Sequence, residues 1–179
     1  FSFVILAAYV NLLAAVLTLA ATLFYVFVST NWLKRTTTQN IVIGGAAGSI
    51  PPVVGWVAGT GSLDLPALFL FAVVFFWTPP HFWALAMLIQ KDYEAAKIPM
   101  LPVVAGREHT VQAIFMYSLV LVAISLVFAT TSAVGLVYLG SAAVLGAIFV
   151  ALAWNLKGDI TTKRARTLYL FSLLYLALL

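Results

Sequence analysis

Residues 65–88 read LPALFLFAVVFFWTPPHFWALAML. The stretch contains no Asp, Glu, Lys or Arg. It is longer than the about 20 residues that an α-helix needs to cross the hydrocarbon core of a bilayer. Its apolar residues do not alternate with a period of two, as they would in a membrane β-barrel strand. The stretch therefore predicts a transmembrane helix.

The composition of the whole chain supports a membrane location. The chain has 179 residues, of which 64% are hydrophobic and 8% are charged, against about 45–50% and about 25% in typical soluble domains. A soluble domain of this size cannot bury so much apolar surface. The composition excludes a soluble globular domain, a disordered chain and a free nucleic-acid binder, and it predicts a lipid bilayer as the surroundings and no nucleic-acid partner. With no Cys, disulfides and thiolate metal sites are also excluded.

Apolar runs of similar character lie on both sides of residues 65–88. We predict an all-α, multi-pass transmembrane helical bundle, because a chain in lipid must satisfy its backbone hydrogen bonds internally. The chain begins at Phe1 and ends at Leu179, each inside an apolar run. We therefore expect residues 1–179 to be a single transmembrane domain, truncated at both ends. The predicted spans are the tail 1–10, then 12–29, 39–58, 65–88, 111–131, 133–154 and a cut span from about 167.

The basic residues indicate an orientation. All nine Lys and Arg residues fall in the predicted loops 30–38, 89–110 and 155–166, which are alternate loops and so lie on one side. The positive-inside rule places that side in the cytoplasm. We predict a protein of the cell (plasma or inner) membrane with cytoplasmic basic loops. The net charge of +4 then follows from topology and from contact with anionic headgroups.

The first candidate site is the loop that contains Lys34 and Arg35, which hydroxyl and amide residues follow, among them Asn40. Arg offers a bidentate fork, Lys a point charge, and hydroxyls neutral donors, so the cluster suits a phosphate group. The alternative interpretation is a basic anchor at a helix end.

The second candidate site contains Asp92 and Glu94, two of only five acidic residues. Mg²⁺ is usually bound by one or two protein carboxylates together with substrate phosphates. A Mg²⁺–diphosphate complex between Lys34, Arg35 and Asp92 is therefore a sensible hypothesis. The alternative is charge balancing in a solvated loop.

The third feature is WTPPHFW at residues 77–83, with His81 inside a predicted span. An ionisable group within a span is a functional candidate; the alternative is a hydrogen bond to a carbonyl that the prolines leave free. Proline pairs at 51–52 and 79–80 should kink their helices. Two broken helices favour an internal cavity. The small-residue stretch 44–48 permits close helix packing.

Together these residues resemble the heme O synthases (protoheme IX farnesyltransferases), a branch of the UbiA-type intramembrane prenyltransferases. The resemblance is dense from about residue 33 to 104, and further on it rests on span order. It is carried by LKRT at 33–36 with Asn40, IGGAAG at 43–48, PP at 51–52 with GW at 55–56, WTPPHFWAL at 77–85, DY at 92–93 and IPMLPVV at 98–104.

The resemblance implies a bundle of nine spans, of which this chain would be roughly the last two-thirds. It implies transfer of a farnesyl group from farnesyl diphosphate to a vinyl group of protoheme IX (heme B), with water added, to give heme O for heme-copper oxidases. It implies Mg²⁺ as cofactor, and a heme A synthase or oxidase assembly factors as downstream partners. By position, Lys34 and Arg35 match the catalytic basic pair at the diphosphate and Asp92 the catalytic metal ligand.

The resemblance also implies substrate-binding roles for Asn40, a recurrent polar position, and for His81, as a heme contact. The sequence departs from the pattern at Ser29, where the family often has Tyr, and at Ala96, where the superfamily often has a second Asp. Glu94 is then the remaining second metal ligand.

An upstream Asp-rich motif is absent from this chain, so we expect the chain to be inactive by itself. Two other functions stay open at this point. One is another UbiA-type prenyltransferase, acting on a quinone or chlorophyll precursor. The other is a non-catalytic transporter or heme-handling membrane protein, although no acidic residue lies mid-span as in proton-coupled transporters.

Overall fold

The structure is a computed structural model that describes residues 1–33 and 36–179. The predicted site residues Lys34 and Arg35 lie outside the described residues. The described part is helical and contains no strand. Its elements are α1 (Ser2–Tyr9), α2 (Leu12–Leu23), the π-helical η1 (Phe24–Leu33), α4 (Asn40–Gly48), α5 (Ile50–Thr60), α6 (Leu65–Leu88), α7 (Gln90–Ala95), α8 (Leu101–Val104), α9 (Gly106–Phe128), α10 (Leu136–Gly158) and α11 (Thr162–Leu178).

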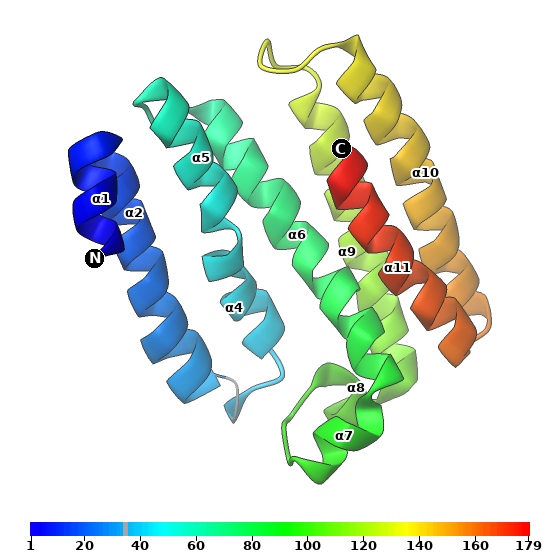
Figure 1. The fold of residues 1–179 in the computed structure, drawn as a ribbon. Helices are drawn as coiled ribbons and strands as arrows, with labels where there is room; N and C mark the ends of the chain where they lie inside the picture. Colours follow the sequence, from blue (N-terminus) through cyan, green and yellow to red (C-terminus); the bar gives the residue numbers. More distant parts are fainter. Residues whose placement is uncertain (34–35) are drawn as a thin grey trace.

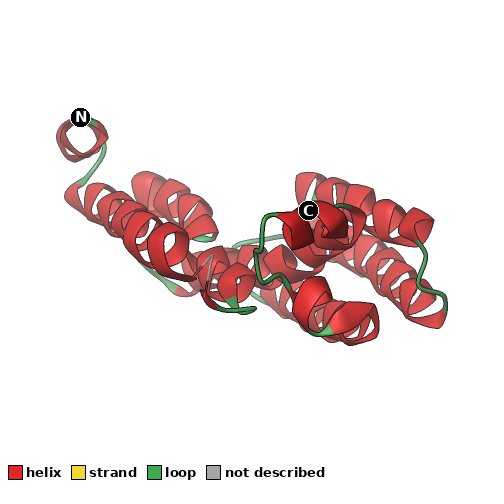
Figure 2. Ribbon diagram, turned by 90° about the horizontal axis from the view of Figure 1, so that it is seen from below, coloured by secondary structure: helices red, strands yellow, loops and turns green. Residues whose placement is uncertain are grey.

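The long helices run alternately up and down through the bundle (Figure 1). Viewed along the bundle, they form an elongated array with the N-terminus at one end (Figure 2). Among the described residues, five helical segments are long and apolar enough to cross a membrane: Leu12–Leu33, Asn40–Thr60, Leu65–Leu88, Gly106–Phe128 and Leu136–Gly158. The predicted all-α membrane bundle is confirmed.

The basic segments gather at one end of the bundle. The end that carries α7 and α8, lowest in Figure 1, and the turn 159–161, at the lower right, is called the basic end. The seven Lys and Arg residues of the described ranges lie in or beside these segments, as the alternating loops predict. They are Lys91, Lys97, Arg107, Lys157, Lys163, Arg164 and Arg166.

Several helix boundaries differ from the predicted spans. α9 begins at Gly106 rather than at 111, α10 ends at Gly158 rather than at 154, and α11 begins at Thr162 rather than at 167. The predicted loop 155–166 thus shortens to three residues. The Lys and Arg residues there are good helix formers, so they continue the helices although they are not apolar.

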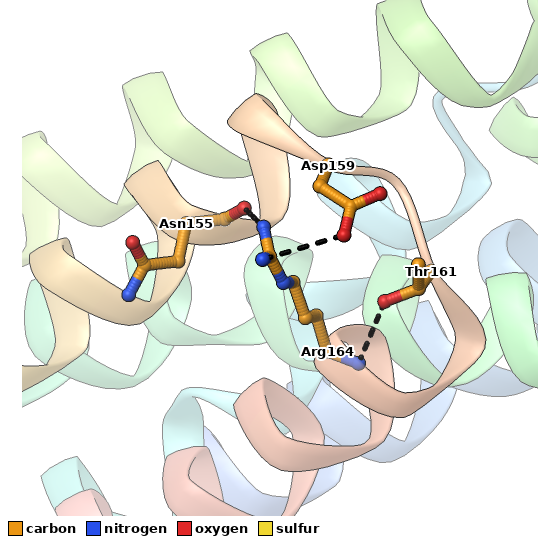
Figure 3. Close-up of polar contacts among 4 residues, drawn as sticks. All are labelled: Asn155, Asp159, Thr161 and Arg164. Atoms are coloured by element: carbon orange, nitrogen blue, oxygen red, sulfur yellow. Dashed lines mark hydrogen bonds and ion pairs between the residues drawn. The ribbon is translucent and has the colours of Figure 1, made fainter.

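The side chain of Arg164 holds the α10–α11 turn. Its guanidinium donates to the carbonyl of Asn155 over 2.6 Å and pairs with the carboxylate of Asp159 at 3.3 Å (Figure 3). The hydroxyl of Thr161 caps α11 by accepting from the Arg164 backbone N–H. The turn therefore fixes α10 against α11 without a long connection.

The two proline pairs have different effects on their helices. The first interrupts its span, because α4 ends at Gly48 and α5 begins at Ile50. Pro51 and Pro52 lack an N–H, so the carbonyls four residues before them have no partner of the usual kind. The second pair lies inside α6, which is continuous from Leu65 to Leu88. The expectation of a second broken helix was wrong.

The buried apolar residues form two clusters, and α6 belongs to both. The larger cluster joins α6, α9, α10 and α11 through residues such as Trp83, Ile114 and Phe149. The smaller cluster joins α2, α5 and α6 through Ala14, Val53, Val57 and Ala67. α6 is therefore the common wall between two packed groups of helices.

Candidate functional site

A cavity of about 710 Å³ lies among α2, η1, α4, α5, α6 and the segment that follows α6. This volume falls in the range of small-molecule sites, about 300–1,000 Å³. The residues that line it are Thr18, Ala21, Thr22, Tyr25, Ser29, Thr30, Asn40, Ile41, Gly44, Gly45, Ala47, Gly48, Ile50, Pro51, Val54, Val74, Trp77, Thr78, Phe82, Tyr93, Ile98 and Met100.

The part of the cavity nearest the basic end is lined by polar residues and is called the mouth. Asn40 begins α4, and Tyr93 lies on α7, and both of these segments are at the basic end (Figure 1). Thr30 contributes a third polar side chain from η1. These residues supply an amide and two hydroxyls, which suit an oxygen-rich head group.

The body of the cavity is apolar, although several threonines line it. Thr18 donates its hydroxyl to the carbonyl of Ala14, and Thr22 donates to Thr18, each over 2.8 Å. Thr78 likewise donates to the carbonyl of Val74 over 2.8 Å. Because these donors are used within their own helices, the threonines add little free polarity to the wall.

Glycines bring α4 close to its neighbours around the cavity. A Cβ at Gly44 would lie 2.7 Å from the hydroxyl oxygen of Ser29 on η1. A Cβ at Gly45 would lie 3.1 Å from the methyl carbon of Thr78 on α6. Close packing therefore explains the first two glycines of the small-residue stretch, as predicted.

Tyr93 is a site residue that the sequence reasoning singled out only as part of a motif. Its ring is half-buried and lines the cavity, whereas the flanking Asp92 and Glu94 are exposed. Burial raises the pKa of the Tyr93 phenol above its usual value. The hydroxyl therefore stays protonated near neutral pH and is able to donate a hydrogen bond at the mouth.

Asp92 and Glu94 lie on α7 on either side of Tyr93 and so close to the mouth of the cavity. Glu94 accepts a hydrogen bond from the amide of Gln90 over 2.9 Å. Among the described residues no group of three His, Cys, Asp or Glu side chains is placed to hold a metal ion. One or two exposed carboxylates suit Mg²⁺ when phosphate oxygens complete its coordination. The donor set therefore fits Mg²⁺ only together with such a ligand.

Asn40, the predicted polar substrate contact, lines the cavity and is only 7% exposed. Its position at the start of α4 places it at the mouth rather than in the apolar body. The structure thus brings Asn40 and Tyr93 to one cavity, with the carboxylates of Asp92 and Glu94 beside it. The role of Asn40 in binding a substrate stays a prediction.

His81 is 6% exposed and is absent from the described lining of the cavity. Its Nδ1 lies 2.7 Å from the hydroxyl of Ser172 on α11. That hydroxyl donates to the carbonyl of Tyr169 over 2.6 Å, so it accepts from His81, whose Nδ1 carries the proton. The hydrogen-bonding alternative is therefore supported, with a hydroxyl as partner in place of a carbonyl that the prolines leave free.

Aromatic stacking holds the His81 ring. It stacks on Trp77 at 4.3 Å between centroids and on Tyr169 at 4.8 Å. The indole N–H of Trp77 donates to the carbonyl of Ser172 over 2.7 Å. Trp77 also lines the cavity. His81 therefore contacts the cavity wall indirectly, by stacking on the indole of Trp77.

Comparisons with known proteins place the sequence in a family. A sequence profile of the UbiA prenyltransferase family matches residues 1–177. The chain is 56% identical to a protoheme IX farnesyltransferase of Roseiflexus sp. over 99% of this chain and 33% of the relative. It is 54% identical to one of Gloeobacter violaceus, over 99% of this chain and 59% of the relative. A third, of Picosynechococcus sp., is 52% identical over 99% of this chain and 57% of the relative.

The chain thus spans between about a third and three fifths of the length of these curated relatives. No solved structure matches the chain.

Proposed function

The chain belongs to the UbiA prenyltransferase family, and we propose that the protein containing it transfers a farnesyl group from farnesyl diphosphate to a vinyl group of protoheme IX. Addition of water then gives heme O. The observation that carries the proposal is the cavity with a polar mouth at the basic end and an apolar body between α2, α4, α5 and α6. The names of the relatives at 52–56% identity support protoheme as the acceptor.

The shape and polarity of the cavity suit an allylic diphosphate. The isoprenoid chain would lie between the apolar walls, and the diphosphate would lie at the mouth, near Asn40 and Tyr93. The connection between η1 and α4 contains Lys34 and Arg35 and joins two elements that line the cavity. We propose that this pair binds the diphosphate through charge-assisted hydrogen bonds.

Asp92 and Glu94 would hold Mg²⁺ against the diphosphate oxygens. When bound, Mg²⁺ would supply positive charge that stabilises the departing diphosphate. The protein's own part is to present these carboxylates from the short helix α7, immediately beside Tyr93.

Bond breaking in this reaction is heterolytic. The carbon–oxygen bond of the allylic diphosphate breaks, and its electron pair leaves with the diphosphate. Lys34, Arg35 and the neutral Tyr93 hydroxyl would stabilise that developing negative charge. The aromatic rings of Trp77 and Phe82 line the wall and would stabilise the allylic cation through their π-faces.

The protoheme acceptor reacts with the allylic cation in the last steps of the proposed reaction. The electrons of the protoheme vinyl group form the new carbon–carbon bond, and water adds to the resulting cation on the acceptor with loss of a proton. The apolar wall keeps bulk water from the allylic cation before that step. His81, which stacks behind Trp77, is proposed to lie on the side where the heme binds.

We also propose in which membrane the protein lies and which end of the bundle faces the cytoplasm. The basic end would face the cytoplasm of a cell membrane, since basic loops are retained there. Farnesyl diphosphate would then enter from the cytoplasmic side. A heme A synthase or an oxidase assembly factor would receive the product.

The proposal is tested by pigment analysis. Membranes are prepared from cells that lack their own heme O synthase and express the full-length protein, and their hemes are extracted and separated. We expect heme O, and we expect its loss in a strain that carries the empty vector. Protoheme alone in both strains, with the protein present in the membrane, would overturn the proposal.

A further inference from the structure

Gly48 differs from the other two glycines that line the cavity. An ideal Cβ at Gly44 or Gly45 meets Ser29 or Thr78 at 2.7 and 3.1 Å. An ideal Cβ at Gly48 has no heavy atom of the described residues within 4 Å, although Gly48 lines the cavity. Close helix packing therefore does not require a glycine at this position, and a side chain added here would extend into open space beside the cavity lining.

Gly48 also lies at a defined depth from the mouth. It is the last residue of α4, and Asn40 at the mouth is the first. Eight residues of helix rise about 12 Å. Beyond Gly48, the wall continues with Ile50, Pro51 and Val54 of α5.

This depth matches the size of the proposed donor. Carbon–carbon bonds of about 1.5 Å give an extended farnesyl chain a length on the order of 10–15 Å. If the diphosphate is held at the mouth, the last isoprene unit passes Gly48. A chain one isoprene unit shorter would end before it.

We propose that Gly48 sets the length of prenyl chain that the cavity accepts, by leaving the wall without a side chain where the terminal isoprene unit of the farnesyl group lies. The inference rests on the proposed function and specifies its substrate. Because the diphosphate is fixed at the mouth, a side chain added at Gly48 would exclude long prenyl chains before it excludes short ones.

The test compares donors in the full-length enzyme. Gly48→Leu is assayed with farnesyl diphosphate and with geranyl diphosphate, with protoheme as acceptor, and the ratio of the two kcat/KM values is measured. One misplaced methylene in an apolar pocket changes kcat/KM by roughly 10- to 200-fold. We expect the ratio to shift toward geranyl diphosphate by at least about tenfold, mainly through loss of the farnesyl reaction.

The matched control is Gly140→Leu. Gly140 lies inside α10, has no described heavy atom within 4 Å of an ideal Cβ, and is outside the described lining of the cavity. This variant should keep the wild-type ratio. Gly48→Ala and Gly48→Val should give smaller shifts in the same direction, and they decide the question if the leucine variant does not accumulate in the membrane.

The outcomes separate the inference from the proposed function. A wild-type enzyme that farnesylates protoheme, together with an unchanged donor ratio in the Gly48 variants, overturns only the inference. An equal loss with both donors in a variant that accumulates normally also overturns it. A wild-type enzyme that uses neither donor overturns the proposed function, and the inference with it.

Discussion

The imidazole of His81 on α6 donates a hydrogen bond to the hydroxyl of Ser172 on α11 across 2.7 Å. The two residues are 91 positions apart in the chain. The same serine accepts from the indole of Trp77 through its carbonyl. One residue of α11 thus orients both the buried histidine and an aromatic wall of the cavity.

We expect Ser172→Ala to destabilise the protein. The substitution leaves the Nδ1 proton of His81 without its partner in a buried site, which costs on the order of 1–3 kcal/mol. Thermal unfolding of the full-length protein in detergent measures the effect. Ser132→Ala, at an exposed turn, is the control; an equal melting temperature for both variants would show that the hydrogen bond does not stabilise the fold.

Asp92→Ala should abolish Mg²⁺-dependent heme O production while leaving the protein in the membrane. The reason is that Asp92 is proposed as the first carboxylate for the metal at the mouth. Turnover is measured across a Mg²⁺ titration, with Glu108→Ala, an exposed carboxylate on α9, as control. Undiminished heme O production by Asp92→Ala contradicts the metal role.

Replacing Lys34 and Arg35 together with Gln should raise the apparent KM for farnesyl diphosphate or lower turnover. The charge-assisted hydrogen bonds to the diphosphate are lost, each worth about 1.5–3 kcal/mol. The control is the double replacement of Lys163 and Arg166 with Gln, which are exposed on α11 at the same end. Unchanged kinetics in the test variant would leave the pair as a topological anchor only.

Tyr93→Phe should lower kcat/KM for farnesyl diphosphate by about tenfold, as expected for loss of one hydrogen bond to a charged group. Burial raises the pKa of the Tyr93 phenol above the usual tyrosine pKa of about 10. The wild-type hydroxyl therefore stays protonated throughout the neutral range of pH. The ratio of wild-type to variant activity should therefore be constant from about pH 6 to 9. A ratio that falls within this range, as a group ionises, would contradict a neutral donor.

The fold could be predicted from the sequence to the extent that hydrophobicity decides it. The uncharged stretch 65–88 corresponds to α6 residue for residue, because charge inside lipid is costly. The ends of α9, α10 and α11 could not be predicted in the same way. Residues 106–110 and 155–158 contain the charged Arg107, Glu108 and Lys157 and are nevertheless helical, since helix formation at the membrane boundary depends on backbone propensity and not only on hydrophobicity.

The site was predicted less completely. Asn40 was singled out and lies at the mouth of the cavity. His81 was also singled out and contacts Ser172 on α11, and its predicted contact with heme stays a prediction. Gly44, Gly45 and Gly48 are equivalent in the sequence. Only the positions of η1 and α6 in space show that the first two pack closely and the third leaves open space.

The central claim is that the cavity between α2, α4, α5 and α6 holds the prenyl chain. Photo-crosslinking tests it most directly, with a farnesyl diphosphate analogue that carries a diazirine on its terminal isoprene unit. The full-length protein in membranes is irradiated, and the adducts are located by mass spectrometry. We expect adducts near Thr18, Gly48 and Val54 that excess farnesyl diphosphate suppresses. Suppressible adducts on α9 or α10 instead would contradict the assignment.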